Sequence, residues 1–86
     1  MKKEEIIEKL TEIRNKRNCN CSASKVAERA YFDRVISELK SLSEDDHVLP
    51  YLEKAQNAVP IRNDETRIRF NVYGYAINVA KRVYGA

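Results

Sequence analysis

Cysteine and histidine are nearly absent from this sequence, which holds two cysteines and one histidine among 86 residues. Cys19 and Cys21 stand one residue apart, closer than the paired spacing of a structural zinc site, and a disulfide across a single residue would close a strained ring. His47 and scattered acids are too few to complete a set of four ligands. We therefore expect no metal centre, no structural disulfide and no cofactor.

Glycine, proline and tryptophan are also scarce, at two, two and none, whereas Asp, Glu, Lys and Arg make up 34% of the chain. This composition is typical of helices, and a hydrophobic fraction of 43% is too high for a wholly disordered chain. We expect one domain, residues 1–86, with a thin core, because a chain this short buries only about 60% of its unfolded surface.

Long apolar runs are missing as well, since no stretch approaches the length of a membrane-spanning helix or of a signal peptide core. We expect a cytoplasmic protein without membrane contact, in which thiols stay reduced. The sequence also lacks a glycine-rich phosphate loop and a partnered nucleophile. The acids before His47, residues 44–46, are explained more simply as a helix start than as a catalytic or cation site. We expect no enzyme activity.

What the sequence does contain is apolar periodicity at helical spacing. Four segments place their apolar residues on one side of a helical wheel, near residues 3–17, 24–42, 46–59 and 64–84. Short connectors between such helices favour antiparallel neighbours. The predicted fold is all-α, a compact four-helix bundle, with the second and fourth helices supplying most of the core.

Local signals predict where these helices begin and end. Ser22 or Ser24 can cap the second helix, and residues 43–46 form a capping-box pattern before the third. A proline such as Pro50 is tolerated only in the first turn, so the third helix begins near Leu49 or a short turn precedes it, and Pro60 ends it.

Residues 67–73 alternate polar and apolar side chains, as an edge strand does, and are rich in residues that favour strands. The alternation stops at Gly74, whereas a helical wheel keeps the polar residues on one narrow strip as far as residue 82. We favour the helix and keep the strand as the alternative. The apolar arc of this helix is broad and is interrupted only by Arg69, which indicates contact with several helices or with a partner chain.

The connector from Ile13 to Ala27 contains no acidic residue. A helix C-terminus and a serine cap explain its cations and serines, yet a cationic connector is also a candidate phosphate-binding surface. The polar strip of the last helix, with Gly74 at its centre, is a candidate to extend that surface, although a solvated face is the simpler explanation. The candidate contacts for a partner or a nucleic acid are Arg14, Lys16, Arg17, Lys25, Arg67, Asn71, Asn78, Lys81 and Arg82.

We expect the protein to act through protein–protein interaction, in a regulatory or inhibitor-like role, with Tyr73, Tyr75 and Tyr84 as apolar anchors. The alternative is a nucleic-acid-binding accessory protein, although a net charge of +3 is small for that class. A third possibility is a homodimer in which the last helices pair across a twofold axis. Binding to phosphates would weaken steeply with salt, which separates the nucleic-acid alternative from the other two.

Overall fold

The computed structural model describes residues 2–16, 23–42 and 48–85, which form four helices and no strand. The helices are α1 (Lys2–Lys16), α2 (Ala23–Lys40), α3 (Val48–Asn57) and α4 (Asp64–Gly85). The all-α four-helix prediction is confirmed, and residues 67–73 are helical rather than extended. α2 and α3 each end two residues earlier than expected. None of the described helices is long and apolar enough to cross a membrane.

Some expected features cannot be placed, because they fall outside the described residues. Pro50, by contrast, can be placed: α3 is described from Val48, so Pro50 lies in its first turn, as predicted. The features outside the described part of the chain are Arg17, Cys19, Cys21, Ser22, the side chain of Ser24, residues 43–46 and His47.

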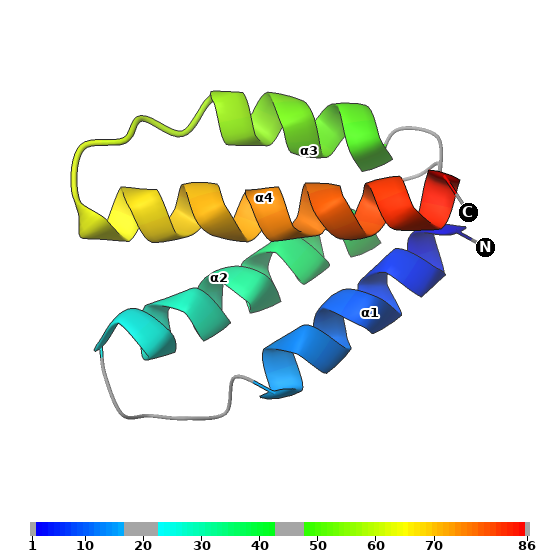
Figure 1. Ribbon diagram of the computed structural model, residues 1–86, viewed down its shortest axis with the longest axis horizontal. Helices are drawn as coiled ribbons and strands as arrows, with labels where there is room; N and C mark the ends of the chain where they lie inside the picture. Colours follow the sequence, from blue (N-terminus) through cyan, green and yellow to red (C-terminus); the bar gives the residue numbers. More distant parts are fainter. Residues whose placement is uncertain (1, 17–22, 43–47, 86) are drawn as a thin grey trace.

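α4 lies at the centre of the bundle and packs against all three other helices (Figure 1). Successive helices alternate in direction, so α1 and α3 run opposite to α4 and α2 runs along it. Hydrogen bonds agree with this arrangement. Tyr31 in the first half of α2 meets Glu65 at the start of α4, and Gln56 near the end of α3 meets Phe70 of α4. Consecutive helices are therefore antiparallel, as predicted, and α2 with α4 is a parallel pair across the diagonal of the bundle.

The core is one cluster of apolar side chains enclosed by the four helices. α1 and α3 each contribute two fully buried residues, Ile6 and Leu10 from α1 and Val48 and Leu52 from α3. α2 and α4 supply most of the rest, as expected. Their buried residues are Phe32, Val35, Ile36 and Leu39 in α2, and Val72, Tyr73, Ala76, Ile77, Val79, Ala80 and Val83 in α4.

The broad apolar arc of α4 is used inside the protein. Because α4 contacts three helices, residues on several of its sides are buried, and the small side chains of Ala76 and Ala80 let neighbouring helices approach closely. Tyr73, which we expected to contact a partner, has only 2% of its surface exposed. Its position on that arc places it in the core, and the expectation for Tyr73 was wrong.

The start of α4 is capped by a residue pair that the sequence reading overlooked. The Asn63 side-chain oxygen accepts a hydrogen bond of 2.9 Å from the Thr66 backbone N–H, and the Thr66 hydroxyl accepts one of 3.1 Å from the Asn63 N–H. This reciprocal pattern satisfies backbone donors that a helix start leaves without partners. The cap explains why α4 begins at Asp64, directly after the connector that follows Pro60.

Gly74 marks a close helix contact within an uninterrupted helix. A Cβ atom at this position would lie 3.1 Å from the Gln56 side-chain nitrogen on α3. That nitrogen in turn donates a hydrogen bond of 3.3 Å to the Phe70 carbonyl. The absence of a side chain at Gly74 therefore leaves room for Gln56 between α3 and α4, at a cost of about 1 kcal/mol in helix propensity.

Candidate interaction groove between α1 and α4

The cations that we predicted as phosphate contacts do not gather on one surface of the described protein. Arg14 is engaged by Asp33 of α2, with its Nε 2.7 Å and its Nη2 3.2 Å from the two carboxylate oxygens. Lys16 is exposed at the C-terminal end of α1, whereas Arg82 lies near the end of α4, beside the N-terminal end of α1 (Figure 1). α1 has 15 residues, so a helix length of about 20 Å separates these positions.

Lys81 lies next to Arg82, whereas two other predicted cations lie at the opposite end of α4. Lys25 and Arg67 are exposed near the starts of α2 and α4. Asp64 and Glu65 occupy the same end and, with Ala23, line a hollow of about 320 Å³ there. Acids therefore accompany these cations, and the continuous basic patch that the nucleic-acid alternative needs is not formed by the described residues.

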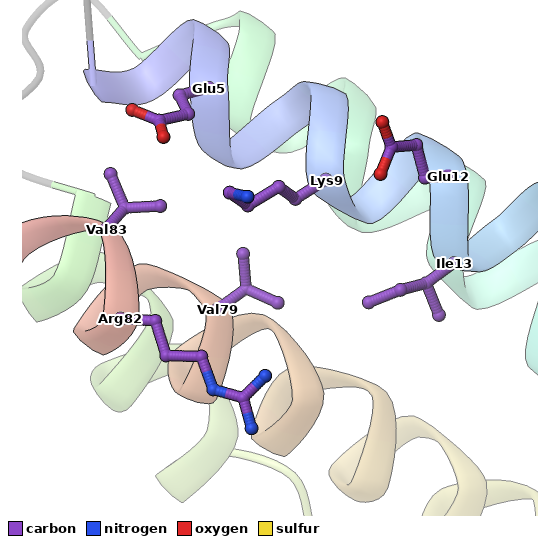
Figure 2. A pocket seen from close by; sticks show the side chains of 7 residues that line it. All are labelled: Glu5, Lys9, Glu12, Ile13, Val79, Arg82 and Val83. Carbon is purple, nitrogen blue, oxygen red and sulfur yellow. The ribbon is translucent and has the colours of Figure 1, made fainter. Parts of the chain in front are cut away.

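A groove between α1 and α4 brings apolar and charged side chains together (Figure 2). Its volume is about 340 Å³. Ile13 of α1 and Val79 and Val83 of α4 form its apolar floor. We call this feature the α1–α4 groove, and its charged rim consists of Glu5, Lys9 and Glu12 on α1 and Arg82 on α4.

The two helices that border the groove differ in the charges that they expose. α1 exposes four glutamates against Lys9 and Lys16, namely Glu4, Glu5, Glu8 and Glu12. α4 contains no acid after Glu65. It exposes three cations, Arg67, Lys81 and Arg82, with Asn71 and Asn78 between them. At the groove itself, the α1 rim combines Glu5 and Glu12 with Lys9, and the α4 rim holds Arg82.

Of the three tyrosines predicted as apolar anchors, Tyr75 has the clearest exposure. Its side chain is 41% exposed, and its ring lies 6.0 Å from the ring of Phe32 between centroids. Tyr75 comes one helical turn before Val79, which places it toward the Ile13 end of the α1–α4 groove. Tyr84 is half-buried and packs against the core. The sequence identified Arg82 as a candidate contact, but it did not identify the groove that Arg82 borders.

A second polar cluster is enclosed between α2, α3 and α4, around the carboxylate of Glu38. Tyr51 donates a hydrogen bond of 2.6 Å to this carboxylate, and Tyr73 lies 3.0 and 3.1 Å from its two oxygens. Arg34, one turn earlier on α2, places its Nε 3.5 Å from Glu38. One acid therefore ties three helices together. Sequence analysis missed it because Glu38 and the two tyrosines lie 13 and 35 positions apart.

Arg69 explains the interruption in the apolar arc of α4. It is half-buried, its Nε atom is buried without a hydrogen-bond partner among the described residues, and its guanidinium opposes the rise in the pKa of Tyr73. Burial, followed by the hydrogen bond to Glu38, raises the pKa of Tyr73 and raises the pKa of Tyr51 to about 12. The pKa of Tyr31 is raised mainly by its hydrogen bond to Glu65. Tyr51 and Tyr73 therefore act as hydrogen-bond donors to Glu38, and Tyr31 acts as a donor to Glu65.

The raised pKa of Tyr51 predicts a loss of stability in alkaline solution. The unfolded chain releases this proton around the ordinary value of 10.0, whereas the folded protein holds it to about 12. The folded state therefore binds more protons in this window, so the contribution is complete below pH 10 and disappears as the pH rises toward 12. Urea unfolding across this pH range should show a smaller loss for Tyr51→Phe than for the wild type. An equal loss in both proteins would contradict this prediction.

Neither the groove nor the Glu38 cluster has the makeup of a metal centre. Within residues 2–16, 23–42 and 48–85, no three side chains of His, Cys, Asp or Glu are placed to hold a metal ion. The chain matches no protein-family model, no curated protein and no solved structure. The function of the α1–α4 groove is therefore argued from its own geometry and charge.

Proposed function

We propose that this protein is a small, non-enzymatic cytoplasmic module that acts by binding another protein chain through the α1–α4 groove, in a regulatory or inhibitor-like role. One observation carries the proposal: two adjacent helices leave an apolar-floored groove of about 340 Å³ between charged rims. A groove of this kind is the form in which helices bind amphipathic segments, because the floor provides apolar contact and the rim selects the partner by charge.

The charge distribution favours this function over nucleic-acid binding. A phosphate backbone would meet the exposed glutamates of α1 next to Arg82, and Arg14 is already occupied by Asp33. With a net charge of +3 and separated cations, the protein has little electrostatic attraction for a polyanion.

Photo-crosslinking in cells of the source organism tests the proposed function. A photoreactive amino acid at Lys9, on the rim of the groove, should give discrete crosslinked protein products. The matched control carries the same amino acid at Ser37, an exposed position on α2 outside the groove. Products specific to position 9 support the proposal. The absence of products, or the same products from both positions, would contradict it.

A further inference from the structure

α3 is attached to the bundle less extensively than the other three helices. α1, α2 and α4 each pack against the other two, whereas α3 packs extensively only against α4, on the side away from α1 (Figure 1). Within α3 only Val48 and Leu52 are buried, and Ala55 adds a partly buried contact with the core. Apolar contact has no preferred direction. The core residues of α3 therefore define its position on α4 only loosely.

The apolar spacing of α3 also suits a second position on α4. Val48, Leu52 and Ala55 follow one another at intervals of four and three residues, so they lie on one side of the helix. A slide of α3 by one turn, about 5.4 Å, would put Leu52 in the place of Val48 and a residue of the next turn in the place of Leu52. Burial of apolar side chains therefore distinguishes the two positions poorly.

Two polar contacts do distinguish these positions. The Tyr51 hydroxyl donates a hydrogen bond of 2.6 Å to Glu38 on α2. The Gln56 side-chain nitrogen donates one of 3.3 Å to the Phe70 carbonyl on α4, beside Gly74. Because the two contacts reach different helices, together they fix both the position of α3 along α4 and its rotation. A slide of about 5.4 Å breaks both, since a hydrogen bond tolerates only far smaller displacements.

The Glu38 cluster, which consists of Glu38, Tyr51 and Tyr73, contributes more to this choice of position than to stability. The Glu38 side chain is only 22% exposed, so its charge loses much of its hydration on folding. The tyrosine hydrogen bonds offset that loss, and removal of Glu38 alone leaves both hydroxyls without their acceptor. Replacement of all three residues by apolar side chains of similar size removes the cost and the gain together, a change that is often neutral for stability.

We infer that the polar contacts of Tyr51 and Gln56 select one position of α3 on α4, whereas the apolar core supplies most of the free energy that holds α3 there. The polar contacts act by excluding the shifted position, in which their donors and acceptors have no partners. The inference goes beyond the proposed function and does not depend on it, because neither residue lines the α1–α4 groove.

A distance measurement between α3 and α4 tests this inference. Spin labels are attached after Lys54→Cys on α3 and Arg67→Cys on α4, two exposed positions, in a parent protein that carries Cys19→Ser and Cys21→Ser. Because α3 and α4 are antiparallel, a slide of α3 changes the separation of the two labels directly. Pulsed electron paramagnetic resonance should give one narrow distance distribution for this labelled parent.

The apolar variant combines Glu38→Leu, Tyr51→Phe, Tyr73→Phe and Gln56→Ala. It should remain helical by circular dichroism and keep a urea midpoint close to that of the labelled parent. Its distance distribution should gain a second population displaced by about 5 Å, one helical turn. Ile6→Val is the matched control, because it weakens the buried core on α1 away from these contacts and should keep the single distance.

Three results would overturn the inference. A single unchanged distance in the apolar variant would show that apolar packing alone positions α3. A urea midpoint lowered as far as that of Glu38→Ala, or a loss of folding, would show that the polar contacts mainly supply stability. A second distance in Ile6→Val would show that any weakening of the core moves α3. None of these results affects the crosslinks from position 9, so the proposed function is judged separately.

Discussion

Replacement of Phe32 by alanine is expected to lower the free energy of unfolding by about 3–5 kcal/mol, the usual cost of truncating a buried aromatic residue. Phe32 has none of its surface exposed and is the largest fully buried side chain of the described core. It lies on α2, which packs against both α1 and α4. Small domains have a total stability of about 5–15 kcal/mol, and one of this size belongs near the lower limit. The loss is a large part of this total, so a substantial fraction of the variant should be unfolded at about 37 °C.

Urea unfolding followed by circular dichroism measures this loss. Ile61→Ala is the matched control, because Ile61 is a large apolar residue that is 55% exposed in the connector before α4. Its stability should stay within about 0.5 kcal/mol of the wild type. A loss of less than about 1 kcal/mol for Phe32→Ala, well below the range for buried aromatic truncations, would show that Phe32 does not support the core as described.

Replacement of Glu38 by alanine is expected to cost about 2–3 kcal/mol, because two tyrosine hydroxyls lose their acceptor at once. Tyr73 is the more affected of the two, since only 2% of its surface is exposed and water cannot easily replace the carboxylate. Tyr51 is half-buried and recovers part of its hydrogen bonding from solvent. The lost hydrogen bonds lie where α2, α3 and α4 meet, so all three helices should unfold together.

A double-mutant cycle isolates the contact between Glu38 and Tyr73. Tyr73→Phe removes the hydroxyl and retains the ring, and it should cost about 1 kcal/mol because Glu38 keeps Tyr51 as a donor. If the hydrogen bond is present, the double variant should lose less than the sum of the two single variants. Additive losses would show that the two side chains do not interact in solution.

The limits of each helix could be predicted to within two residues because they depend on neighbouring residues. The decision at residues 67–73 illustrates this, since the polar strip that continued to residue 82 outweighed a short strand-like alternation. The cap formed by Asn63 and Thr66 was also within reach of sequence reasoning, because the two residues stand three positions apart.

The sequence predicted less well which individual side chains are exposed and which already have a partner within the protein. Tyr73 and Tyr75 are two residues apart on α4, yet one is buried and the other is 41% exposed. Both belong to the apolar arc, and only the positions of α1, α2 and α3 around α4 separate them. Arg14 shows the same limit, because its partner Asp33 is 19 positions away on another helix.

The sequence by itself determined four amphipathic helices, a single small core and the charge that each helix carries, because these follow from side-chain spacing of three to four residues. Only the tertiary structure decided that α4 is central, that Glu38 joins three helices and that α1 and α4 leave a groove between them. The physical reason is that these contacts join residues far apart in the chain. Their formation depends on how the helices pack, which periodicity within one helix does not specify.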